Sequence, residues 1–246
     1  MGRLIMARVK KLTPIMCNTL GPDDVRIAEV LLASPDAWDD PAPVREAENW
    51  LAEWLGLDQA FGFMGGRAAL YAIVRALNLS QGDDVIVPGL TCQVVVNAFE
   101  YNGATCVHAD IEEETFNMDY RQLAAKLTPR TRAVLLQHTF GVPARDTLAI
   151  VALARKHNIT IIEDVAHGLG GRLGGRKLGT FGDVSFFSTE RTKMINTIHG
   201  GFAATSDPAI RGELTGIQNQ SPFPPTEKIR DILSTLLFCY HTKVHR

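Results

Sequence analysis

Strand-like and helix-like stretches alternate along the chain from about residue 60. A helical pattern over residues 67–79 precedes the apolar strand "VIVP" (85–88), and a second one over residues 92–103 precedes the strand "ATCVHAD" (104–110). Alternation of this kind with short connections is typical of a parallel sheet covered by helices on both faces. The pattern therefore predicts a three-layer α/β/α domain with a mostly parallel sheet.

The same alternation continues to residue 207. Asp119 and Asp146 each precede a helical pattern, over residues 120–127 and 147–158, and we expect each of them to cap its helix. The further strands that we expect are residues 132–139, 159–164, 183–188 and 201–207. We therefore assign residues 60–207 to one large domain.

Two shorter segments, residues 1–59 and 208–246, flank this domain. The first contains two helical patterns, and the second of these places Trp50 and Trp54 four residues apart on one face. We expect an N-terminal helical segment whose tryptophans pack on the large domain. The last segment contains two further helical patterns separated by a proline-rich stretch.

The composition argues against several kinds of partner. The 25 basic and 27 acidic side chains give a formal charge of -2, so we expect no attraction to nucleic acid or to an anionic membrane surface. Neither a signal sequence nor about 18 consecutive apolar residues is present, which favours a cytoplasmic protein. No metal site is expected, and we read four cysteines as reduced, mostly buried thiols: Cys17, Cys92, Cys106 and Cys239.

Candidate functional residues are expected where strands give way to loops, because ligands of open α/β sheets bind beyond the carboxyl ends of the strands. Gly65 and Gly66 open a helix, where backbone N–H groups can bind a phosphate, although the pair also suits an ordinary tight turn. Asp164 ends a strand three residues before His167, and its carboxylate suits a helix cap, a metal ion or a cationic ring nitrogen.

Two more candidates lie at strand exits. Ser188 and Lys193 follow an apolar strand, and lysine is the side chain used for Schiff-base chemistry. Cys92 starts a helix directly after another strand, which also fits a simple turn. A phosphate turn, a strand-end carboxylate and an amine, in this order, match what pyridoxal phosphate requires. The residues therefore predict this cofactor.

Six segments in colinear order carry a resemblance to a known family. They are "GGRAAL" (65–70), "VIVPGLTC" (85–92), "ADIEEETFNMD" (109–119), "LLQHTFGVPARD" (135–146), "IIEDVAHGLGG" (161–171) and "FSTERTKMINTIHGGFAAT" (187–205). With them, the chain resembles the large domain of the DegT/StrS-type sugar aminotransferases, which are pyridoxal-phosphate enzymes of fold type I.

The resemblance implies roles for individual residues. Lys193 matches the lysine that forms a Schiff base with the cofactor, Asp164 the partner of the pyridine nitrogen, and His167 the residue placed near the ring. The phosphate contacts match Ser188 and the turn of Gly66, Arg67 and Ala68, while Cys92 stands where the family often has an aromatic side chain against the ring.

The resemblance also implies a function. It predicts transfer of an amino group, with glutamate as donor, to a keto-sugar linked to a nucleotide or a lipid, by a homodimer. Family members continue into a smaller C-terminal domain on the order of a hundred residues, and residues 208–246 are expected to be the start of a truncated one. Two alternatives remain: a catalytically silent scaffold that dimerises with a full-length relative, and another fold-type I chemistry such as desulfuration or dehydration.

Overall fold

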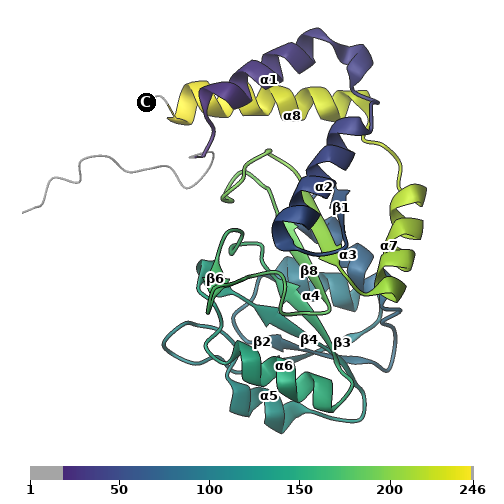
Figure 1. Cartoon of the computed structure of the whole chain (residues 1–246), viewed down its shortest axis with the longest axis vertical. Coiled ribbons are helices and arrows are strands. Elements are labelled where there is room, and N and C mark those ends of the chain that lie inside the picture. The colour runs from purple at the N-terminus through teal and green to yellow at the C-terminus, as the bar shows by residue number, and fades with distance from the viewer. Residues whose placement is uncertain (1–18, 245–246) are drawn as a thin grey trace, which may run out of the picture.

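The main feature of the protein is a seven-stranded sheet. The computed structural model describes residues 19–244, and Figure 1 shows the sheet with helices on either side of it. The strand order is β1-β9-β8-β5-β4-β2-β3, and β9 is antiparallel to its two neighbours whereas the other pairs are parallel. The strands are β1 (Gln59–Phe63), β2 (Asp84–Pro88), β3 (Thr105–Ala109), β4 (Thr131–Gln137), β5 (Thr160–Asp164), β8 (Val184–Ser188) and β9 (Gly201–Thr205).

Helices cover both faces of this sheet. One face is covered by α3 (Gly66–Ala76), α4 (Gln93–Glu100) and α7 (Pro208–Gln220), and the other by α2 (Ala42–Leu55), α5 (Tyr120–Lys126) and α6 (Thr147–Lys156). The remaining elements are η1 (Pro35–Ala37), η2 (Thr139–Gly141), η3 (Tyr240–Val244) and a small hairpin of β6 (Arg172–Leu173) and β7 (Arg176–Lys177). The predicted three-layer fold with a mostly parallel sheet is confirmed.

Successive strand residues point into two separate cores. In β4, Leu135 belongs to the buried cluster that includes side chains of α3 and α4, while the adjacent Leu136 belongs to the cluster that includes side chains of α2 and α6. Phe186 and Phe187 of β8 divide in the same way. This division follows from the alternation of side chains along a strand, and it explains why residues 133–136 of β4 are apolar at every position.

A third apolar cluster lies away from the sheet. Helices α1 (Pro22–Ala33) and α8 (Thr226–Cys239) lie side by side above the sheet in Figure 1. Their facing side chains form a buried cluster that includes Val25, Leu233 and Leu236, together with Ile198 from the connection between β8 and β9. Within residues 19–244, no helix is long and apolar enough to cross a membrane.

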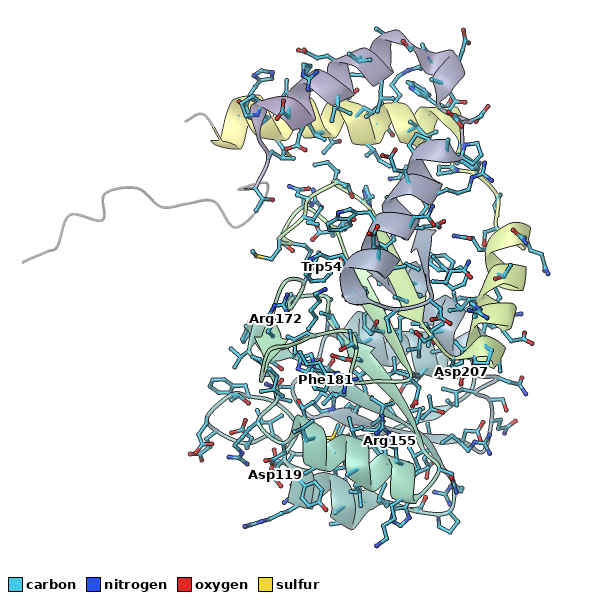
Figure 2. All side chains as sticks on the ribbon, viewed as in Figure 1. Trp54, Asp119, Arg155, Arg172, Phe181 and Asp207 are labelled. Atoms are coloured by element: carbon cyan, nitrogen blue, oxygen red, sulfur yellow. The ribbon has the colours of Figure 1, made fainter. Side chains whose placement is uncertain are left out.

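The sequence did not predict every packing detail correctly. Trp54 packs on the core beneath α2, where the Lys177 ammonium lies 4.8 Å from its ring centroid, and Figure 2 shows it close to the β6–β7 hairpin. Trp50 stacks on Trp54, with 6.1 Å between ring centroids, but is 51% exposed. The expected packing on the large domain therefore holds for Trp54 alone.

The two expected helix caps differ as well. Asp119 caps α5, since one carboxylate oxygen accepts the N–H groups of Arg121 and Gln122 at 2.7 and 3.0 Å (Figure 2). Asp146 occupies the cap position of α6 but makes no cap hydrogen bond, because its carboxylate turns to the guanidinium of Arg145. The expectation that Asp146 caps its helix is therefore wrong.

This difference gives a test of the fold. Asp119→Ala should lower the free energy of unfolding by about 1 kcal/mol, because two backbone donors lose their acceptor. Asp146→Ala is the matched control, and it should cost less than about 0.5 kcal/mol because it removes only a surface ion pair. Urea unfolding of the two variants and the wild type measures both values, and an equal loss in both variants would contradict the assignment of the caps.

Candidate active site

A cavity of about 620 Å³ opens at the carboxyl ends of the parallel strands. It lies between the start of α3, the ends of β4, β5 and β8, and the connection that carries Lys193. All eight residues that the sequence singled out line it: Gly66, Arg67, Ala68, Cys92, Asp164, His167, Ser188 and Lys193. The structure therefore brings the whole predicted set together, from four separate stretches of the chain.

The first turn of α3 forms one wall of the cavity. No side chain caps this helix, and its first intrahelical bond is the one from the Ala69 N–H to the Gly65 carbonyl. The N–H groups of Arg67 and Ala68 precede that bond, so the helix itself gives them no acceptor. A Cβ on Gly66 would lie 2.9 Å from the Cβ of Ser188, so only glycine lets the turn approach β8 this closely.

Asp164 ends β5 with its carboxyl group buried at the cavity wall. One of its oxygens accepts the Ala166 N–H at 2.9 Å. Burial raises the pKa of Asp164 to about 6, and the Ala166 hydrogen bond and the charge of Lys193 only partly oppose this. A second cation at this carboxylate would lower the free energy of its charged form.

Lys193 lies half-buried in the connection between β8 and β9, where its backbone N–H donates to the Glu190 carbonyl at 2.8 Å. Burial lowers the pKa of its amine, and the charges of Asp164, Glu190 and Cys92 oppose this shift. The lower pKa increases the fraction of neutral amine, which is the nucleophilic form.

His167 lies opposite an aromatic residue that the sequence analysis missed. The rings of Phe140 and His167 are nearly parallel, with 6.0 Å between centroids, and both line the cavity. Phe140 has a φ of 53° in the tight turn after β4, and Gly141 follows with a φ of 82°. The expected strand 132–139 does not predict a turn at Phe140. The one sequence signal for it is Gly141, because glycine favours a left-handed position.

The cysteines are not all buried as expected. Cys92 is exposed and lines the cavity, Cys106 is partly buried, Cys239 is buried, and these three thiols are free. Burial, followed by the charge of Glu100, raises the pKa of Cys106 to about 12. Cys17 lies outside the described residues. Among residues 19–244, no three His, Cys, Asp or Glu side chains are grouped so as to hold a metal ion.

Basic side chains gather at the rim of the cavity. Arg67 and His199 both line it, beside the bridge that joins residues 65 and 200. Burial and then the positive charges of Lys228, Arg191 and Arg67 lower the pKa of His199. In the described part of the chain, neither Arg67 nor Lys228 forms an ion pair with a carboxylate. The rim is therefore suited to an anionic group.

The donor set of this cavity fits a phosphorylated pyridine aldehyde. Helix N–H groups and the Ser188 hydroxyl suit a phosphate, the buried Asp164 carboxylate suits a ring N–H, and the Lys193 amine suits an aldehyde carbon. The fold and the cavity together define the large domain of a fold-type I pyridoxal-phosphate transferase.

Comparison with known proteins agrees with this class. Residues 27–231 match the model of the DegT/DnrJ/EryC1/StrS aminotransferase family, and the chain belongs to that family. Its members are pyridoxal-phosphate-dependent aminotransferases.

Individual relatives give the likeness in more detail. The chain is 38% identical to GDP-perosamine synthase of Escherichia coli O157:H7 over 68% of this chain and 46% of that protein. It is 36% identical to UDP-N-acetyl-3-dehydro-alpha-D-glucosamine 3-aminotransferase of Acidithiobacillus ferrooxidans over 71% of this chain and 47% of that protein. The X-ray structure of the aminotransferase from Psychrobacter cryohalolentis superimposes with a TM-score of 0.78 at 25% identity, covering 94% of this chain and 64% of the other. The chain thus spans about half the length of the curated relatives that it matches.

The buried carboxyl group of Asp164 gives a test that needs no cofactor. Since its pKa is about 6 in the folded protein and about 3.9 in an unfolded chain, the native state binds more protons between these values. Wild-type stability should therefore fall as the pH rises through this window. Asp164→Asn has no buried carboxyl group to ionise. The variant should therefore be more stable than the wild type by about 2 to 3 kcal/mol at pH 8, and this difference should disappear below about pH 4. Urea unfolding at the two pH values measures it, and a gap that does not change with pH would contradict the burial of an ionising group.

Proposed function

We propose that this chain is a pyridoxal-phosphate-dependent aminotransferase of keto-sugars, with glutamate as amino donor. The observation that carries the proposal is the convergence of the Lys193 amine, the Asp164 carboxylate and the first turn of α3 on one cavity. The sequences of the relatives support it, because the matched proteins are named for amino-sugar synthesis or for amino transfer to a nucleotide-linked sugar.

Each cavity residue has a role in this proposal. The N–H groups of Arg67 and Ala68, together with the Ser188 hydroxyl, bind the cofactor's phosphate. When bound, pyridoxal phosphate supplies an electron sink for the carbanion formed at the donor's α-carbon. Asp164 holds a proton on the pyridine nitrogen, which in turn keeps the carboxylate charged in spite of its burial.

Lys193 has two roles in turn. Its amine would hold the cofactor at the aldehyde carbon, and as a free neutral amine it would take a proton from the donor's α-carbon. The low pKa caused by burial favours the neutral amine that both tasks require. His167 and Cys92 lie at the cavity wall, where we propose that they contact the cofactor ring.

The proposed acceptor is a keto-sugar linked through phosphate to a nucleotide or a lipid. The guanidinium of Arg67 at the rim supports an anionic substrate, because Arg67 forms no ion pair with a carboxylate among residues 19–244, and the charges of Lys228 and Arg191 act on the neighbouring His199 as well. We further propose a cytoplasmic homodimer, in which a second copy helps to enclose the cavity.

The alternative function is a catalytically silent scaffold that keeps the fold and dimerises with a full-length relative. The observation in its favour is that the chain covers only about half of its curated relatives.

Absorption spectroscopy of the purified protein tests the proposal. Wild-type protein with added pyridoxal phosphate should develop a visible absorption band, which glutamate should bleach. Lys193→Ala should not develop the band, because the amine that binds the aldehyde is gone. Lys156→Ala is the matched control, since it removes an exposed lysine at the end of α6, outside the residues that line the cavity.

The possible results separate the two functions. A band in the wild type and in Lys156→Ala that bleaches with glutamate supports the aminotransferase. A stable band that glutamate leaves unchanged supports the silent scaffold. Wild-type protein without any band would refute the proposed role of Lys193.

A further inference from the structure

The connection between β8 and β9, residues 189–200, carries Lys193 and is closed at its base. The hydroxyl groups of Thr189 and Thr197 lie 2.7 Å apart within hydrogen-bonding distance, and the Thr197 N–H donates to the Thr189 carbonyl at 2.8 Å. The Thr189 N–H donates to the Gly200 carbonyl at 2.9 Å. A Cβ on Gly200 would collide with both threonine hydroxyls, so glycine is required for this closure.

Beyond this base, much of the loop has little packing. Met194 is 65% exposed and Ile195 is 40% exposed, and Arg191 and Thr192 are exposed as well. Large apolar side chains left in solvent do not hold a loop in place. The position of Lys193 therefore depends on a small number of anchors.

Ile198 is the strongest of these anchors. Its side chain is only 2% exposed and belongs to the apolar cluster of α1 and α8, whose other buried members come from outside the loop. Its backbone has a φ of 65°, a conformation that a β-branched residue rarely adopts. Such strain persists only where the surrounding structure holds the residue in place.

Two polar contacts connect the same region to Lys193. The Ile198 N–H donates to the side-chain oxygen of the buried Asn196 at 2.8 Å, which fixes the turn that leads back toward Lys193. Just before α1, the Thr19 hydroxyl donates to the Lys193 carbonyl at 3.4 Å. The α1–α8 cluster and Thr19, just before α1, therefore contact the loop on both sides of the exposed Met194 and Ile195.

We propose that Ile198 is a positioning residue, whose anchoring in the α1–α8 cluster holds the Lys193 amine in the cavity. The inference rests on the proposed function for the chemical role of Lys193, but the placement of the loop does not depend on it. It also assigns a task to the helix pair, which takes no part in covering the sheet. A purely structural role would make Ile198 important for stability alone, without any specific effect on Lys193.

Two measurements on the cofactor-free protein separate these roles. Hydrogen exchange of the amides of residues 190–196 reports the order of the loop. The rate at which pyridoxal phosphate followed by borohydride labels Lys193, located by peptide mapping, reports the position of the amine. In Ile198→Ala, we expect exchange to rise and labelling to slow, each on the order of tenfold.

Ile210→Ala is the matched control, because Ile210 is buried in the core between α7 and α3 and loses the same side-chain atoms. It should lower the melting temperature but leave both the exchange of the loop and the labelling of Lys193 close to wild type. Ile198→Gly removes the strain together with the anchor, since glycine adopts positive φ readily. It should show the same loss of order and labelling as Ile198→Ala.

Each outcome decides the proposal. Wild-type exchange and labelling in Ile198→Gly, or equal changes in Ile210→Ala, would overturn it. Faster exchange with unchanged labelling would overturn it as well, because the anchor would then not position the amine. If Ile198→Ala does not fold, Ile198→Val should show smaller changes in the same direction. If pyridoxal phosphate does not label wild-type Lys193 at all, the proposed function fails. The rate at which a simple amine-acylating reagent labels Lys193 then replaces the labelling measurement, and an equal rate in the wild type and Ile198→Ala would overturn the anchor.

Discussion

The buried carboxylate of Glu163 connects β5, which ends at the cavity, to His138 at the end of β4 and to the turn before β8. It accepts the N–H groups of Gly179, Phe181 and Gly182 at 2.6, 2.7 and 2.9 Å, and the Nε2–H of His138 at 3.0 Å. The His138 proton must lie on Nε2, because Nδ1 accepts the Ala144 N–H at 3.1 Å. Four donors satisfy a group that has no exposed surface, and the loss of any one donor would leave a buried charge short of a partner.

The hydrogen bonds of Glu163 also determine which way the side chain of Asp164 points. Because side chains alternate along a strand, fixing Glu163 on one face of β5 directs Asp164 to the other face, at the cavity. The two neighbouring carboxyl groups then differ in their partners: Glu163 has four donors, whereas Asp164 has one backbone N–H. Because Asp164 is buried with one backbone donor, a cationic ligand would stabilise the charged form of its carboxyl group.

The sequence predicted which residues line the cavity better than it predicted their surroundings. Gly66, Asp164 and Lys193 could be found because each follows or precedes an element with a clear period, and the carboxyl ends of parallel strands meet at one edge. Phe140 and His199 could not be found in this way. Phe140 depends on a left-handed turn, and the place of His199 beside Arg67 depends on a bridge between residues far apart in sequence.

The same limit applies to the sheet. The strands 85–88 and 159–164 were visible as apolar runs, whereas β1 contains the polar Gln59 and a glycine and shows no clear period. That β9 runs antiparallel to β8 is set by the long connection carrying Lys193, which has no helix to return the chain in the parallel sense. Periodicity identifies elements, but the direction of a strand depends on what joins it to its neighbour.

That connection also fixes the exit of the Lys193 loop relative to the first turn of α3. Gly201 begins β9, and a Cβ there would collide with the backbone of Gly65 and Gly66, so the exit of the lysine loop lies directly against the start of α3. A rigid ligand that is held at both a phosphate and an aldehyde demands a fixed separation between the two protein groups that bind it. The contact of the glycines holds the exit of the loop at the first turn of α3, and Ile198, three residues earlier, lies in the α1–α8 cluster. In the proposed binding mode, the separation therefore depends on contacts at both places, one beside the sheet and one in the α1–α8 cluster.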